Sequence, residues 1–146
     1  MTVVLVWVYV LSYEGRMKIL VVDDSRIIRD RLVNLLDVIK GVCVVEQAEN
    51  AENALLAYRK LRPEVLILDI RMQGASGLEV LQQVKSEQSA PYVIMLTNFP
   101  YPQYRKKCFE KGADHFLDKS TGFDEINEII RKMVEKNGLV VCSDND

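Results

Sequence analysis

Short hydrophobic runs recur along this chain, and stretches with a helical pattern separate them. Five runs are too short for helices and rich in β-branched residues, which is typical of buried parallel strands; they span residues 18–22, 42–47, 64–68, 92–96 and 114–118. Between the runs, apolar side chains recur at intervals of three and four residues, which predicts amphipathic helices, and Ser25 and Asn50 are placed to cap the first two. The first helix is expected to stop at Gly41, with an apolar face formed by Ile28, Leu32, Leu35 and Ile39. This alternation predicts an α/β fold in which helices cover both faces of a five-stranded parallel sheet.

Polar residues of particular kinds end four of the five runs. The first run ends at Asp23 and Asp24, the third at Asp69, the fourth at Thr97 and the fifth at Lys119. Because a parallel sheet gathers the carboxyl ends of its strands along one edge, we expect these side chains to converge there. Clustered carboxylates raise one another's pKa unless a cation neutralises them, and Mg²⁺ accepts such oxygen ligands. The pattern therefore predicts a site for a divalent cation and a phosphoryl group.

Asp69 follows the most hydrophobic run, which is expected to form the central strand. A carboxylate held there can act as a nucleophile and form an acyl phosphate, while a bound cation offsets its repulsion from the phosphoryl oxygens. Lys119 can supply a positive charge, and Thr97 can donate a hydrogen bond to a phosphoryl oxygen. An aspartate pair alone would indicate only a favourable charge near a helix N-terminus. The combination favours a phosphoryl site.

The segments that carry these residues resemble the receiver domain of two-component response regulators. The resemblance runs from Met17 to about Lys136 and is carried by the segments KILVVDDS, PEVLILDIRMQGASGLEVL, VIMLTN and GADHFLDKS. It implies the flavodoxin-like strand order 2-1-3-4-5. It also implies that Asp69 is the phosphoacceptor and that Lys119 contacts the phosphoryl group. The Mg²⁺ or Mn²⁺ ligands implied in this way are Asp23, Asp24, Asp69 and the backbone carbonyl of Arg71.

The same resemblance implies a conformational switch. The hydroxyl of Thr97 would move toward the phosphoryl group, and Phe116, three residues before the lysine, would follow it. The partner surface that changes would then include Tyr101, Tyr104 and Arg105, although Tyr104 can equally be an ordinary packing aromatic. Hydrolysis of the acyl phosphate needs a water in line with it, and Arg71 and Phe99 are expected to flank that approach. The bulk of Phe99 is expected to slow hydrolysis.

Two positions depart from the family pattern. Gln73 follows Met72 where the family commonly has proline, and Ser120 follows Lys119 where the family commonly has proline with a cis bond. A cis bond to serine would cost about 3–4 kcal/mol. The peptide is therefore either strained, or trans with a rearranged loop, and the choice bears on how far Lys119 reaches.

The resemblance implies a cytoplasmic, single-domain response regulator, which is a signalling domain and not an enzyme beyond its own phosphorylation and dephosphorylation. Its expected partners are a sensor histidine kinase or phosphotransfer protein and a downstream protein. A phosphohydrolase with an aspartyl nucleophile is an alternative, but it would have an acid where Arg71 stands. A flavin- or nucleotide-binding protein would have a glycine- or hydroxyl-rich loop where Asp23 and Asp24 stand. A receiver-like module that is never phosphorylated is a third alternative, against which the full set of site residues argues.

Composition changes this picture little. With 146 residues the chain is one domain, and its net charge of -2 gives no basic stripe for nucleic acid beyond the short cluster 105–107. The three cysteines lack metal-ligand spacing and indicate a reducing compartment; Cys43 and Cys108 are expected to be buried, and His115 to be structural.

The first residues of the chain do not fit the alternating pattern. Residues 1–11 are almost entirely apolar, but this run is shorter than the roughly 20 residues that span a membrane, and it lacks the flanks of a secretory signal. It is either an extra strand or, as we favour, an extension upstream of a natural start at Met17. We therefore divide the chain into an extension (1–16), a receiver domain (17–138) and a tail (139–146).

Overall fold

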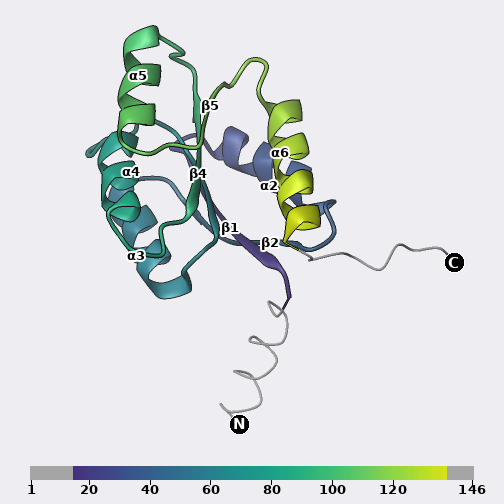
Figure 1. The fold of residues 1–146 in the computed structure, drawn as a ribbon. Helices are drawn as coiled ribbons and strands as arrows, with labels where there is room; N and C mark the ends of the chain where they lie inside the picture. The colour runs from purple at the N-terminus through teal and green to yellow at the C-terminus, as the bar shows by residue number, and fades with distance from the viewer. Residues whose placement is uncertain (1–14, 138–146) are drawn as a thin grey trace, which may run out of the picture.

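Five parallel strands form a single sheet in the computed structural model, which describes residues 15–137 (Figure 1). The strands are β1 (Met17–Val22), β2 (Val42–Ala48), β3 (Val65–Leu68), β4 (Tyr92–Thr97) and β5 (His115–Asp118). Their order, β2-β1-β3-β4-β5, confirms the predicted flavodoxin-like topology. Each strand differs from its predicted range by one residue at one end. The central strand is β3, as expected, and all four of its residues are buried.

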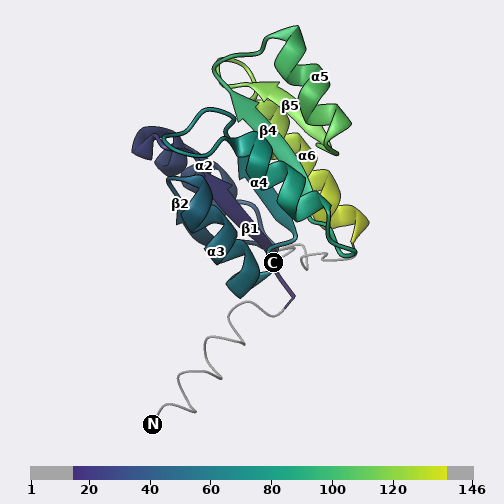
Figure 2. The ribbon, with the colours of Figure 1, turned by 90° about the vertical axis from the view of Figure 1, so that its left-hand side faces the viewer.

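Helices cover both faces of the sheet, so its strands bury side chains on both sides. The helices are α2 (Arg26–Asp37), α3 (Ala51–Leu61), α4 (Gly77–Lys85), α5 (Pro102–Glu110) and α6 (Phe123–Lys136). One face carries α3, α4 and α5, and the other carries α2 and α6; Figure 2 shows the molecule from the side of the first three. In β1, Leu20 packs in the core under the first face, and Ile19 and Val21 pack in the core under the second. Burial on both faces explains why the strands are continuous apolar runs and not alternating ones.

The helix starts follow the predicted capping residues. Ser25 Oγ accepts a hydrogen bond from the backbone N–H of Ile28 at 3.4 Å, and Asn50 Oδ1 accepts one from Asn53 at 2.8 Å. The end of α2 differs from the prediction, because the helix stops at Asp37, before Gly41. Ile39 is nevertheless buried, since the chain turns it into the core just past the helix end.

The predictions for the chain ends lie almost entirely outside the described residues. These are the extension 1–16, of which only residues 15 and 16 are described, and the tail 139–146. Within residues 15–137, none of the helices is both long and apolar enough to cross a membrane. Cys108 is buried as expected, but Cys43, on edge strand β2, is only half-buried.

Candidate functional site

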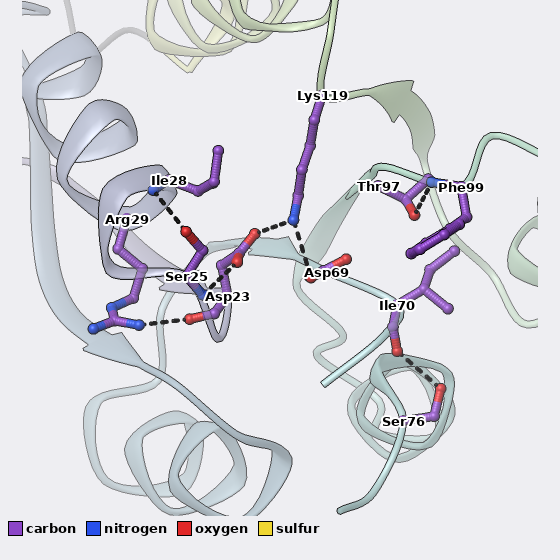
Figure 3. A network of polar contacts seen from close by, with 10 residues as sticks. All are labelled: Asp23, Ser25, Ile28, Arg29, Asp69, Ile70, Ser76, Thr97, Phe99 and Lys119. Atoms are coloured by element: carbon purple, nitrogen blue, oxygen red, sulfur yellow. Dashed lines mark hydrogen bonds and ion pairs between the residues drawn. The ribbon is translucent and has the colours of Figure 1, made fainter. Parts of the chain in front are cut away.

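The polar residues that end the strands converge at the carboxyl edge of the sheet. Asp23 follows β1, Asp69 follows β3, Thr97 is the last residue of β4 and Lys119 follows β5. All four are buried, with between 0 and 6% of their surface exposed, whereas Asp24 is exposed. Figure 3 shows the Asp23 and Asp69 carboxylates on either side of the Lys119 ammonium. The predicted convergence of these side chains is therefore observed.

Lys119 reaches two carboxylates at once. Its Nζ lies 2.6 Å from Asp23 Oδ2 and 3.0 Å from Asp69 Oδ2 (Figure 3). All peptide bonds of the described residues are trans, including the bond between Lys119 and Ser120. The Ser120 backbone N–H and hydroxyl both donate to Asp118 Oδ1, at 2.9 and 2.8 Å. Serine thus builds its own turn after β5, and the absence of proline does not shorten the reach of the lysine.

Asp23 is fixed by residues of the helix that follows it. The Ser25 backbone N–H donates to Asp23 Oδ1 at 2.8 Å, and Arg29 Nη1 donates to the Asp23 carbonyl, also at 2.8 Å (Figure 3). The sequence pattern did not reveal the role of Arg29. Arg29 lies four residues after the helix cap Ser25, on the first turn of the helix and on the side of the aspartates. This spacing is the signal that could have revealed it.

The site holds more negative than positive charge. Burial, and next the neighbouring Asp23 carboxylate, raise the pKa of Asp69 to about 6, although Lys119 acts in the opposite direction. Burial likewise raises the pKa of Asp23, against its hydrogen bond from Lys119. Burial by itself would lower the pKa of Lys119, but its contacts with both carboxylates outweigh this and raise it. One ammonium therefore does not neutralise the group, which favours binding of a further cation.

The donor set fits a hard divalent cation. One carboxylate oxygen from each of Asp23, Asp24 and Asp69 can be chosen so that all three lie within 4.8 Å of one another. Such oxygen ligands suit Mg²⁺, which keeps several waters and takes few protein ligands.

A close approach between backbone segments shapes the loop after Asp69. The carbonyl of Ile70 accepts hydrogen bonds from Ser76 Oγ and from the Gly77 N–H, at 3.1 and 2.8 Å. A Cβ atom at Gly77 would lie 1.8 Å from the Asp69 carbonyl oxygen, so only glycine allows α4 to begin here. The Arg71 carbonyl, which the resemblance implies as a metal ligand, follows in the same loop.

Both implied switch residues, Thr97 and Phe116, are buried. Thr97 Oγ1 accepts a hydrogen bond from the Phe99 backbone N–H at 2.9 Å (Figure 3). Phe116 is turned into the core and is 7% exposed. The guanidinium carbon of Arg105 lies 5.9 Å from the centroid of the Phe116 ring. These contacts place Phe116 between the core and the surface that carries α5.

Aromatic residues gather above the loops after β3 and β4. Tyr101 is 47% exposed, and its ring stacks with that of Tyr104 at a centroid distance of 6.0 Å. Tyr104 also packs against the core, so it is both a packing residue and part of the surface. Arg71 Nη2 donates to the Tyr104 hydroxyl at 3.0 Å, and the Arg71 guanidinium lies over the Phe99 ring at 4.2 Å. The contact between Arg71 and Tyr104 was not predicted from the sequence.

Comparison with known proteins agrees with this geometry. The family model of the response regulator receiver domain matches residues 19–131. The chain therefore belongs to the response regulator receiver domain family of two-component systems. It is 36% identical over 118 residues to the uncharacterised transcriptional regulatory protein YvfU of Bacillus subtilis, a match that covers 81% of this chain and 59% of that protein. It is 31% identical over 116 residues to the response regulator GacA of Pseudomonas aeruginosa, covering 80% and 54% respectively.

Solved structures agree with this assignment. A DNA-binding response regulator of the LuxR family from Staphylococcus aureus superposes with a TM-score of 0.74 at 28% identity, covering 80% of this chain and 97% of that one. The chain spans little more than half the length of the curated relatives named above. What those whole proteins do therefore does not transfer directly to this chain.

Proposed function

We propose that this chain accepts a phosphoryl group on Asp69 from the phosphohistidine of a sensor histidine kinase or phosphotransfer protein. The observation that carries the proposal is the position of the Asp69 carboxylate, buried at the carboxyl edge within one cluster of three carboxylates and one ammonium. A purely structural aspartate would be matched one to one by its partner. Here the carboxylates outnumber the ammonium. A divalent cation can therefore bind them and also offset the negative charge that a phosphoryl group would add.

In the proposed reaction an Asp69 carboxylate oxygen attacks the phosphorus atom as the bond between phosphorus and the donor's imidazole nitrogen breaks. The electron pair of that bond returns to the imidazole ring, which takes up a proton from solvent. A Mg²⁺ held by Asp23, Asp24, Asp69 and the Arg71 carbonyl would supply positive charge against the repulsion between nucleophile and phosphoryl oxygens. The Lys119 ammonium, already 3.0 Å from Asp69 Oδ2, would contact a phosphoryl oxygen.

The signal would then pass through Thr97. Because its oxygen already accepts a hydrogen bond from the Phe99 N–H, the hydroxyl proton can be donated to a phosphoryl oxygen. Movement of Thr97 would let Phe116 shift within its pocket and alter the surface of Tyr101, Tyr104 and Arg105. That surface is proposed to meet the downstream partner, which is a protein and not nucleic acid.

Reversal would need water. A water oxygen attacks the phosphorus in line, the bond to Asp69 breaks, and the carboxylate is restored. Arg71 and Phe99 are proposed to flank that approach, which makes the chain its own slow phosphatase. The phosphohydrolase alternative lacks the second acid at position 71, where a guanidinium contacts Phe99 and Tyr104.

Incubation with acetyl phosphate and Mg²⁺, followed by intact-mass measurement, tests the proposal. The wild-type chain should gain the mass of one phosphoryl group, and Asp69→Asn should gain none. No adduct on the wild type, or an equal adduct on the variant, would overturn the assignment.

A further inference from the structure

The loop after the phosphoacceptor carries a cation whose charge the proposed phosphorylation step does not use. Arg71 lies two residues after Asp69, so the two Cα atoms are at most about 7 Å apart, by the length of an extended chain. The Arg71 side chain is exposed, and its guanidinium spans from this loop to the beginning of α5. It thus joins the segment that holds Asp69 to the surface that holds Tyr101 and Tyr104.

Contacts of two kinds hold the guanidinium in that place. Its Nη2 donates a hydrogen bond to the hydroxyl of Tyr104 at 3.0 Å, which depends on direction. Its guanidinium carbon lies over the Phe99 ring, 4.2 Å from the ring centroid, and more distantly over the Tyr104 ring at 5.8 Å; such attraction depends less on direction than a hydrogen bond does. The guanidinium can therefore turn on Phe99 and exchange its hydrogen-bond partner without losing the stacking.

A phosphoryl group on Asp69 would be a stronger partner for Arg71 than Tyr104 is. The phenol is neutral, whereas an aspartyl phosphate would carry close to two negative charges and several acceptor oxygens. Charge-assisted hydrogen bonds are about twice as strong as neutral ones, and guanidinium binds phosphate through two parallel bonds. Since the two partners differ in their attraction for Arg71, phosphorylation can shift the equilibrium between them.

We propose that Arg71 is a further phosphoryl-contacting residue, which exchanges its hydrogen bond with Tyr104 for bonds to the phosphoryl group on Asp69. This inference rests on the proposed function, because it needs a phosphoryl group at Asp69. Its consequence is a second connection between the site and the partner surface. In the proposed switch Thr97 acts through Phe116, whereas Arg71 acts through the Phe99 ring and Tyr104. Because Tyr104 stacks with the exposed ring of Tyr101, a movement of Tyr104 would also reach Tyr101.

Fluorine NMR of the full chain labelled with 3-fluorotyrosine tests the exchange directly. The Tyr104 resonance is assigned by its loss in Tyr104→Phe. In the wild type, acetyl phosphate and Mg²⁺ should move this resonance. Arg71→Gln should move it in the same direction without any phosphoryl donor, because both changes remove the same hydrogen bond. Phosphorylation of that variant should then move the resonance less than phosphorylation of the wild type does, because only the route through Thr97 and Phe116 remains. Arg71→Lys keeps the charge but loses the planar fork. Its Tyr104 resonance should lie between those of the wild type and Arg71→Gln.

The control is Arg131→Gln, which removes an exposed arginine on α6 that bonds within its own helix to Asn127. It should respond like the wild type. Intact mass measured on the same samples separates the two proposals. An adduct at Asp69 with an unmoved Tyr104 resonance, or with an equally large movement in Arg71→Gln, overturns the role of Arg71 alone. Absence of any adduct overturns the proposed function and this inference together.

Discussion

Two lysines of this chain bind partly or fully buried aspartates, and the two sites differ in the balance of their charges. At the first, Lys85 on α4 forms one ion pair, 2.7 Å long, with Asp114 just before β5. The same carboxylate oxygen also accepts the Val93 backbone N–H at 2.8 Å. At the second, Lys119 is shared between Asp23 and Asp69, and Asp24 adds another carboxylate nearby.

The two sites differ as a balanced ion pair differs from an unbalanced cluster of charges. At Lys85 a single positive charge meets a single negative charge, and the pair joins α4 to the start of β5. At Lys119 the carboxylates outnumber the ammonium, and burial together with Asp23 raises the pKa of Asp69 to about 6. An excess of buried negative charge would destabilise an ordinary core. A phosphoryl site that depends on a cation requires such an excess.

Replacement of each lysine by methionine should separate the two sites most clearly. Lys119→Met should slow phosphorylation by acetyl phosphate by about a hundredfold, the effect of losing one well-placed electrostatic contact. Lys85→Met should leave that rate unchanged and lower the free energy of unfolding by about 1–2 kcal/mol, because Asp114 loses its charged partner. Time-resolved intact mass and urea unfolding measure the two effects. Equal phosphorylation rates for the two variants would contradict the proposed difference between the two lysines.

Removal of Mg²⁺ should affect only the unbalanced site. A ligand that binds the folded chain at a hundred times its Kd stabilises it by about 2.7 kcal/mol, so the wild type should unfold at a higher temperature in Mg²⁺ than in chelator. Asp24→Asn should lose most of this shift. Asp30→Asn, which removes an exposed carboxylate on α2, should keep it. A shift that survives in Asp24→Asn would place the cation elsewhere.

The raised pKa of Asp69 predicts a stability that depends on pH in a definite direction. A carboxyl group whose pKa is higher in the folded chain binds more protons there, so stability falls as pH rises from about 4 to about 6. Without Mg²⁺, Asp69→Asn should therefore be more stable than the wild type by about 1–2 kcal/mol at pH 7, and this gain should vanish below about pH 4. Asp114→Asn should instead be less stable at pH 7. Denaturant unfolding across this pH range measures whether the stability gain of Asp69→Asn depends on pH in this way.

The smallest expected effect concerns the lifetime of the phosphoryl group. Phe99→Ala should shorten it several-fold, because removal of the ring opens the proposed approach of water and removes the face on which Arg71 stacks. Phe109→Ala, which removes an exposed ring on α5, should not change it. The decay of the adduct after removal of acetyl phosphate measures both lifetimes. An unchanged lifetime in Phe99→Ala would refute the predicted role of Phe99.

The sequence predicted the convergence at the sheet edge because both strand direction and strand ends are local properties. An apolar run ending in Asp69 can be identified without knowledge of its neighbours. The contacts that it could not predict depend on side-chain conformation or on distant partners. The bond from Arg71 to Tyr104 joins residues 33 apart, and the ion pair of Lys85 joins residues 29 apart. The choice of a trans bond before Ser120 likewise depends on the turn that Asp118 forms with it.

Chemical mapping of the acceptor tests the central claim most directly. Borohydride reduces an acyl phosphate to an alcohol, so treatment of the acetyl phosphate-labelled chain, followed by peptide mass analysis, marks the aspartate that reacted. We predict that the mark falls on Asp69, depends on Mg²⁺, and is absent from Asp114, whose charge is balanced by Lys85. A mark on Asp114, on Asp23 or on Asp24, or none at all, would contradict the account.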